Sequence, residues 1–330
     1  MVKLDLRDVY FTVPVWVNHQ KYLRFLWKGT MWEFACLPFG LASAPRDFTK
    51  LMKPVVGMLC KMGVRLTVYL DDILIMAESI QLANQHAQLV FGTLDNLGFV
   101  VNHEKSVMIP SSQMEFLGFL VHSTTTCMTL TLPREKVRKI QWECQKALTV
   151  SSLTLQKLTS LVGLLNCSIQ AVFPAPLHNL HLQKLKNQHL SPSMNYKSKV
   201  QLSPQAREEL IWWRDSLMAW NSKAMVNGDP DLTIETDASL LGWGAVCSGI
   251  RTGGHWTQFK RLLHINCLEL MGGAFAVKAF TQHKTKVKVL LLMDNITVVT
   301  YINKMGGTRS PILSSIASNC GLGLFNAKTV

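Results

Sequence analysis

Two adjacent aspartates, Asp71 and Asp72, lie between two short apolar runs, residues 64–70 and 73–76, that favour the arms of a hairpin. Adjacent carboxylates at a tight turn repel each other, and a divalent cation such as Mg²⁺ neutralises them well. The alternative is an ordinary turn, because Asp is a common turn residue. Taken alone, the pair leaves a metal site and a plain turn open.

A third carboxylate, Asp5, lies in an alternating apolar segment, residues 3–13, that predicts a strand. An unpaired charge in an apolar strand is costly. If this strand lies beside the hairpin, Asp5, Asp71 and Asp72 converge and can hold two metal ions. Such a pair of ions can activate an attacking 3′-hydroxyl and stabilise a leaving pyrophosphate.

A second set of carboxylates follows later in the chain. Asp237 lies in a predicted strand, residues 232–237, where alternation puts it on the face opposite Ile234. Glu269 lies in the first turn of a predicted helix, residues 267–282, and Asp294 ends a strand at 287–293. Structural roles stay open for two of them. Asn266 and Glu269 have the spacing of a capping box, and Asp294 is suited to cap the next helix.

The elements that must position these groups can be outlined from periodicity. Helices are predicted at 44–62, 79–97 and 205–220, strands at 99–101, 116–121 and 242–248, and a mostly helical region at 134–186. A further helix is predicted from about residue 296. The Asn-Gly-Asp-Pro sequence at 227–230 is a turn signal and the preferred domain boundary.

Composition points to a folded protein with a polyanionic partner. The chain has 330 residues, 48% hydrophobic and 17% charged, with 34 Lys and Arg against 21 Asp and Glu, a net charge of +13. Residues 144–207 contain no Asp or Glu but six Lys, which favours contact with nucleic acid. Eight scattered cysteines predict small buried side chains rather than a zinc site. Without a signal peptide or membrane span, an intracellular protein is expected, cytoplasmic or nuclear.

Five segments, in order, resemble the motifs of reverse transcriptases. They are residues 3–10 (KLDLRDVY), 37–45 (LPFGLASAP), 69–72 (YLDD), 97–105 (LGF with Asn102 and Lys105) and 116–118 (FLG). The likeness is strongest to long-terminal-repeat-type and DIRS-like retrotransposons. The order Asp237, Glu269, Asp294 then resembles the ribonuclease H fold.

The resemblance implies a role for each candidate residue. Asp5, Asp71 and Asp72 would be catalytic metal ligands of a polymerase, and Asp237, Glu269 and Asp294 those of a ribonuclease H. Each site would hold two Mg²⁺ ions, with Mn²⁺ as the alternative. The substrate-binding residues would be those that stack under the incoming sugar, approach the nucleotide and template, or shield the pyrophosphate: Tyr10, Phe39, Gly40 and Lys105. The partners would be an RNA template, a DNA primer, an RNA–DNA hybrid and deoxynucleoside triphosphates.

The predicted fold is multidomain α+β. Residues 1–130 would form a reverse transcriptase palm with partial fingers, 131–228 a helical thumb and connection, and 229–330 an incomplete ribonuclease H-like α/β domain. The resemblance implies a chain truncated at both ends, without the fingers segment that precedes the first motif and without a fourth acidic ligand. An unpaired edge strand is then expected in the incomplete ribonuclease H-like domain. A nucleic-acid-binding protein without activity, or one with ribonuclease H activity alone, are the alternatives.

Overall fold

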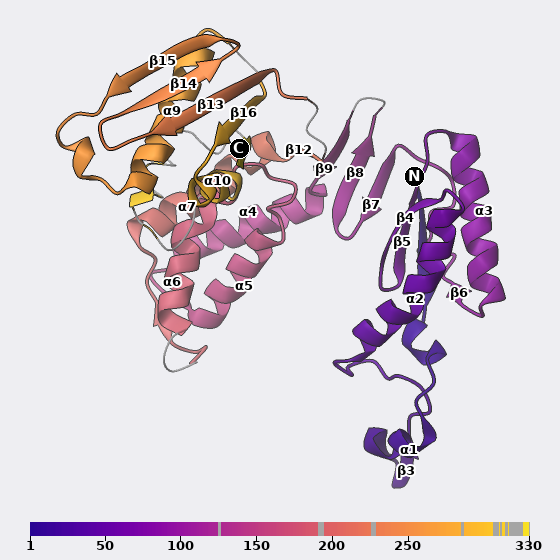
Figure 1. The fold of residues 1–330 in the computed structure, drawn as a ribbon. Helices are drawn as coiled ribbons and strands as arrows, with labels where there is room; N and C mark the ends of the chain where they lie inside the picture. The colour runs from indigo at the N-terminus through magenta and orange to yellow at the C-terminus, as the bar shows by residue number, and fades with distance from the viewer. Residues whose placement is uncertain are drawn as a thin grey trace. The chain divides into compact units, whose positions relative to one another are not determined.

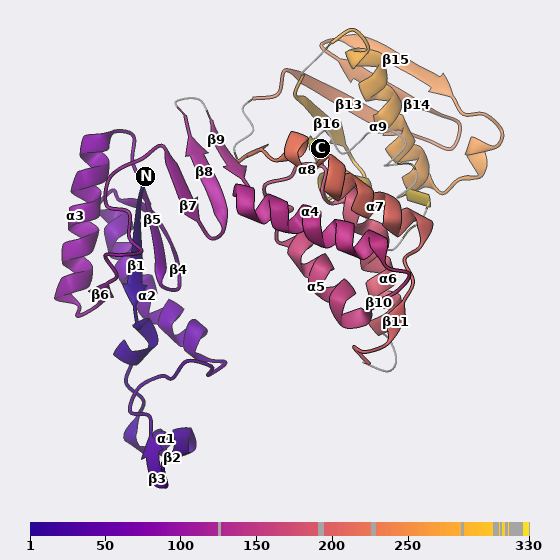
Figure 2. The same ribbon diagram turned by 180° about the vertical axis from the view of Figure 1, so that it is seen from behind.

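A computed structural model describes residues 1–124, 127–190, 195–225, 229–284, 287–305, 310, 312–313 and 316, and the backbone of 326–329. The chain separates into two compact units, Met1–Thr125 and Thr126–Val330 (Figure 1, Figure 2). Both mix helices with sheets, as the α+β prediction requires. The three-domain division at 130 and 228 stays a prediction.

The first unit is built on an antiparallel sheet of order β4-β5-β1-β6. Its strands are β1 (Val2–Arg7), β4 (Arg65–Tyr69), β5 (Asp72–Met76) and β6 (Val100–Val101). Helices α2 (Ala44–Lys61) and α3 (Ile80–Asn96) pack against it. Alternation sends Leu4 and Ile75 into the core with Phe48 and Leu94. The neighbouring positions on β1 and β5, including Asp5 and Asp72, therefore lie on the other face.

Two strand predictions in this unit were wrong in extent. The strand predicted at 3–13 ends at Arg7, because Asp8 adopts a left-handed conformation (φ 54°) and a 3₁₀ turn, Val9–Thr12, follows. The strand predicted at 116–121 is a hairpin of β7 (Gln113–Phe116) and β8 (Phe119–Ser123). Its turn residues Leu117 and Gly118 both have positive φ, as a type I′ turn requires.

The segment that follows β1 in the sequence and precedes α2 forms several short elements. It comprises α1 (Val17–Gln20), a 3₁₀ turn (Lys21–Leu23), and a hairpin of β2 (Arg24–Trp27) and β3 (Thr30–Glu33). Trp27 and Trp32 of this hairpin are exposed. The hairpin leads into the loop that carries Phe39 and Gly40.

The second unit begins with a helical part. Its helices are α4 (Arg134–Thr149), α5 (Leu155–Asn166), α6 (Leu180–Leu190), α7 (Pro204–Asp215) and α8 (Leu217–Trp220), with a 3₁₀ turn at Leu177–Asn179. Two short strand pairs join them, β9 (Met128–Thr131) with β12 (Lys223–Ala224) and β10 (Leu153–Thr154) with β11 (Lys199–Val200). The helix predicted at 205–220 breaks at Ser216.

Trp213 of α7 is fully buried, and its Nε1 donates to the carbonyl oxygen of His178 at 2.8 Å. The ring of Trp212 stacks on the His178 ring at 3.9 Å between centroids. Both tryptophans therefore pack within the second unit.

A five-stranded sheet of order β15-β14-β13-β16-β17 follows in the same unit. Its elements are β13 (Leu232–Ala238), β14 (Gly242–Cys247), β15 (Ile250–His255), β16 (Val289–Met293), β17 (Asn326–Thr329), α9 (Ile265–Thr281), α10 (Ile296–Asn303) and a 3₁₀ turn at Lys260–Leu262. Strand β15 was missed, since the Thr-Gly-Gly sequence hides its pattern. Strand β17 pairs with β16 in parallel, so β16 is not an edge strand.

Helix α9 packs on one face of this sheet, against β13 and β14. Gly272 faces the sheet, because a Cβ built there would contact the Cβ atoms of Ala238 and Trp243 at 3.4 Å. Glu269 is carried on the same helix, so this packing sets its height over the sheet.

The cysteine prediction was partly wrong. Cys144, Cys247 and Cys267 are buried, whereas Cys60 and Cys167 are exposed. Cys320 lies outside the described residues. Within the described part of the chain, no helix has the length and apolar character needed to cross a lipid bilayer.

The close approach of β14 and β15 gives a stability prediction. A Cβ at Gly253 would lie 2.6 Å from the backbone oxygen of Trp243, whereas a Cβ at Gly244, its register partner, would meet nothing within 4 Å. We expect Gly253→Ala to lower the free energy of unfolding by about 2 kcal/mol or more, because backbone must move. Gly244→Ala should stay within about 1 kcal/mol of the wild type. Urea unfolding of both variants checks this, and equal losses would contradict it.

Candidate active sites

The first candidate group lies at one end of the sheet in the first unit. Antiparallel pairing of β1 with β5 sets Asp5 opposite Asp72. Asp71 and Leu70 form the tight turn between β4 and β5, where Leu70 has a φ of 54°. The backbone N–H of Leu6 donates to the Asp71 carbonyl oxygen at 2.8 Å and holds this turn against β1. The predicted hairpin and its position beside the first strand are thus confirmed.

The charges around Asp5 oppose one another. Burial, which leaves Asp5 7% exposed, is the main cause that raises its pKa. Lys105 and Lys3 act to lower this pKa, and the nearby charges of Asp71 and Asp72 act to raise it. The four charged groups therefore surround Asp5 closely enough to influence its protonation.

Lys3 is a member of this group that the sequence reasoning missed. Its Nζ lies 3.0 Å from Oδ1 of Asp72. That oxygen is buried and accepts no hydrogen bond, so the contact is a charge pair without hydrogen-bond geometry. Alternation along β1 puts Lys3 on the face of Asp5, which is the signal that could have found it.

Lys105 reaches this site because its loop is fastened to β1. The N–H of Asn102 donates to the Asp5 carbonyl oxygen at 2.8 Å, and the Asp5 N–H donates to Oγ of Ser106 at 3.0 Å. Lys3 and Val107 exchange a further pair of backbone hydrogen bonds. The loop thus continues the sheet, and Lys105 lies within it.

Tyr10 lies near enough to Asp71 to be affected by its charge, and it contacts Phe39, which Gly40 follows in the chain. The buried ring of Tyr10 contacts Phe39 edge-on at 5.2 Å and Phe48 at 6.0 Å. Burial raises the pKa of Tyr10, and the charge of Asp71 adds to the effect. Phe39 is 59% exposed, and Gly40 has a φ of 91° that favours glycine.

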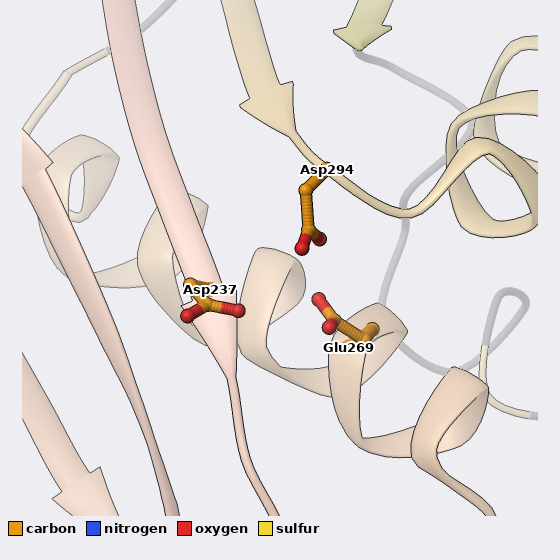
Figure 3. A group of neighbouring side chains, drawn as sticks. All are labelled: Asp237, Glu269 and Asp294. Atoms are coloured by element: carbon orange, nitrogen blue, oxygen red, sulfur yellow. The ribbon is translucent and has the colours of Figure 1, made fainter. Parts of the chain in front are cut away.

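The second candidate group comes from three elements of the second unit. Asp237 is on β13, Glu269 in the first turns of α9, and Asp294 directly after β16 (Figure 3). One carboxylate oxygen of each lies within 4.8 Å of the others. In Figure 3 the side chains of Glu269 and Asp294 point toward each other, with Asp237 beside them. Parallel pairing of β13 with β16 brings the strand ends together.

The capping roles that the sequence left open do not apply to these carboxylates. Helix α9 starts after His264, whose ring accepts a hydrogen bond from the Asn266 N–H, so Asn266 is not the N-cap. Asn295, and not Asp294, caps α10, since its side chain accepts from the Val298 N–H. Glu269 and Asp294 are thus available for other chemistry.

The electrostatics of Glu269 suit a cation ligand. Glu269 is 5% exposed, and its Oε2 is buried without a hydrogen-bond partner. Burial raises the pKa of Glu269 to about 7, with the charges of Asp294 and Asp237 adding to the shift. A buried, unpaired oxygen among three carboxylates is a costly arrangement unless a hard divalent cation binds it. The donor set therefore fits Mg²⁺ or Mn²⁺.

Asp237 and Asp294 open onto a pocket of about 1000 Å³. The pocket is also lined by residues of β13, β14 and β15, among them Glu235, Gly244, Gly253 and Arg251. Because Gly244 of β14 and Gly253 of β15 have no side chains, the pocket is bounded there by backbone atoms.

Comparisons with known proteins agree with this geometry. Residues 1–121 match the family of reverse transcriptases (RNA-dependent DNA polymerases). Polyprotein P3 of Commelina yellow mottle virus is 24% identical over 245 residues, covering 74% of this chain and 12% of that polyprotein. The Pro-Pol polyprotein of feline foamy virus is 27% identical over 190 residues, 56% of this chain and 15% of its own length. The Tf2-3 transposon polyprotein of Schizosaccharomyces pombe is 27% identical over 147 residues, which cover 44% of this chain and 10% of that polyprotein.

Solved structures share the fold. The foamy viral protease–reverse transcriptase in complex with an RNA/DNA hybrid matches with a TM-score of 0.57 and 18% identity, over 100% of this chain and 43% of that one. A form of that protein in complex with double-stranded DNA matches with a TM-score of 0.57 and 19% identity, over 100% of this chain and 56% of that one. The match over residues 1–121 and the likeness to retroelement polyproteins together support a retroelement reverse transcriptase fragment. The chain spans 10 to 15% of the length of these curated relatives.

The raised pKa of Glu269 predicts how metal-free protein responds to pH. Because this pKa is about 7 against an ordinary 4.5, the folded state holds a proton that the unfolded state releases. The contribution to stability is present below pH 4.5 and lost as the pH rises through 7, roughly 3 kcal/mol at most. In urea unfolding with EDTA, the free energy of unfolding of Glu269→Gln should therefore increase relative to that of the wild type as the pH rises from 4.5 to 7. Parallel pH profiles would contradict the burial of this carboxylate.

Proposed function

We propose that this chain carries two active sites of a retrotransposon, an RNA-directed DNA polymerase and a ribonuclease H. The polymerase would occupy residues 1–130 and the ribonuclease residues 229–330, with 131–228 as thumb and connection. The family match over residues 1–121 supports the first assignment. The likeness over 245 residues extends past residue 121 and so supports a relationship beyond the polymerase.

At the polymerase site, Asp5, Asp71 and Asp72 would be the metal ligands. The register that sets Asp5 opposite Asp72, beside the turn with Asp71, is the observation that carries this proposal. Lys105, close to Asp5, would shield the negative charge of the departing pyrophosphate. The Tyr10 ring, supported by Phe39, would lie under the incoming sugar and exclude a 2′-hydroxyl by its bulk.

The Tyr10→Val variant should then accept ribonucleotides in a primer-extension assay, because the ring that excludes the 2′-hydroxyl is gone. The Tyr10→Phe variant keeps the ring and should not accept them.

At the ribonuclease site, Asp237, Glu269 and Asp294 would be the ligands. Three carboxylates from separate elements within 4.8 Å, with one buried oxygen unpaired, carry this part of the proposal. Two Mg²⁺ ions at each site, or Mn²⁺ in their place, would activate the attacking oxygen and stabilise the leaving one. The protein's own part is to hold the carboxylates close together, and metal binding must overcome the raised pKa of Glu269.

Nucleic acid is the partner that the second unit's charge supports. A pocket of about 630 Å³ is lined by α4, α5 and β11, with Lys139, Lys146, Lys157 and Lys199 against one carboxylate, Glu143. Four lysines lining one pocket could bind the backbone phosphates of a template and primer. The substrates would be an RNA template, a DNA primer, their hybrid and deoxynucleoside triphosphates.

Ribonuclease H activity alone is a second candidate. It is favoured by the contact of Lys3 with Asp72, because an ammonium at 3.0 Å already neutralises one polymerase ligand. No such counter-ion contacts the second carboxylate group among the described ion pairs.

One assay tests both activities. Purified protein is incubated with a labelled DNA primer recessed on a labelled RNA template, with Mg²⁺ and deoxynucleotides. Asp72→Asn should lower primer extension about a hundredfold or more, and Asp237→Asn should lower RNA cleavage to a similar degree, because each removes a metal ligand. Template cleavage without primer extension would favour the ribonuclease alone.

Matched carboxylates give the controls. Asp95→Asn lies at the surface on α3, and Glu208→Gln lies at the surface on α7, outside both carboxylate groups. Both variants should keep both activities. If neither nucleic acid strand changes length with the wild type, both activities are excluded. Tight, salt-sensitive binding of the hybrid would then indicate a binding protein without activity.

A further inference from the structure

One side chain, Asn295, makes hydrogen bonds to two elements of the second unit. Its Oδ1 accepts from the Val298 N–H at 3.1 Å and so caps α10. Its Nδ2 donates to Oδ1 of Asn266 on α9 at 3.0 Å, across 29 positions of sequence. A carboxamide can make both contacts because it offers an acceptor and a donor at once.

The two partners lie next to the carboxylates of the ribonuclease site. Asn295 directly follows Asp294, and Asn266 precedes Glu269 by three residues on α9, which places the two on one side of the helix. The amide pair therefore ties the helix that carries Glu269 to the segment that carries Asp294.

The hydrogen bond between Asn295 and Asn266 would oppose the repulsion between two carboxylates. Glu269 and Asp294 have oxygens within 4.8 Å of each other, and like charges at that distance repel. The tie itself is neutral, so it adds no further negative charge to the group. An aspartate at position 295 would keep the cap but lose the donor and increase the repulsion.

We propose that Asn295 and Asn266 are positioning residues, which hold Glu269 and Asp294 at the separation that a divalent cation needs. This inference rests on the ribonuclease site proposed above. The alternative is that Asn295 is an ordinary helix cap whose bond to Asn266 has no bearing on the metal. Side chains that orient metal ligands typically change metal affinity 10- to 100-fold when removed.

Three variants of the full chain separate the tie from the cap. Asn266→Ala removes the acceptor of the tie and leaves the cap of α10 in place. Asn295→Ser keeps a good N-cap residue but is too short to reach Asn266, and Asn295→Ala loses both contacts. The stability of α10 should therefore follow the cap, whereas metal affinity should follow the tie.

The measurement is a titration with Mn²⁺ alone, with free ion followed by electron paramagnetic resonance. Asp294→Asn identifies the binding that belongs to this site. We expect all three variants to weaken that binding about tenfold, and Asn266→Ala combined with Asn295→Ser to weaken it no more than either alone. Urea unfolding in EDTA should single out Asn295→Ala as the least stable.

Two results would overturn the inference, and they are distinguishable. If the wild type binds Mn²⁺ at this site and the tie variants bind it equally well, the pair is structural and the site stands. If the wild type shows no Mn²⁺ binding that Asp294→Asn removes, the metal site itself fails, and the positioning role fails with it.

Discussion

Repulsion between carboxylates held close together is the constraint around which both candidate sites are arranged. Asp237, Glu269 and Asp294 have oxygens within 4.8 Å of one another, and Glu269 is nearly fully buried. Burial and like charges both disfavour the ionised state, so the fold must supply rigid elements that keep the groups in place. A protein that gained nothing from this arrangement would be more stable with neutral residues at these positions.

The two units meet this constraint in different ways. In the first, backbone hydrogen bonds of β1, the β4–β5 turn and the Lys105 loop fix Asp5 beside its neighbours, and lysines offset the charge. In the second, strand pairing and the packing of α9 on the sheet bring the carboxylates together, the Asn295–Asn266 hydrogen bond joins two of the segments that carry them, and no lysine is paired with them among the described contacts. The second arrangement leaves its charge available to a cation.

Much of this could be predicted from sequence because it depends on local patterns. Alternation along β13 gave the exposed face of Asp237, and apolar arms gave the hairpin around Asp71 and Asp72. Predictions failed where a few backbone angles decide the outcome. The left-handed Asp8 ends β1 early, and Leu117 with Gly118 turns an expected strand into a hairpin. Strand β15 escaped notice because its glycines carry no hydrophobic signal.

Side-chain partners were the least predictable feature. The cap positions of α9 and α10 depend on which residue adopts extended backbone before the helix, and this placed His264 and Asn295 where Asn266 and Asp294 had been considered. The contacts of Lys3 and Asn295 depend on elements that are far apart in sequence. Such contacts follow from tertiary packing, which periodicity does not describe.

The most direct test of the account is anomalous diffraction from crystals of the chain soaked in Mn²⁺. The account predicts a peak about 2.0–2.6 Å from carboxylate oxygens of Asp237, Glu269 and Asp294, including the Oε2 of Glu269 that lacks a hydrogen bond. It also predicts a peak at Asp5, Asp71 and Asp72 once nucleic acid and nucleotide are bound. Absence of any peak at Asp237, Glu269 and Asp294, with the Glu269 carboxyl hydrogen-bonded to protein, would contradict the claim that these carboxylates converge to hold metal.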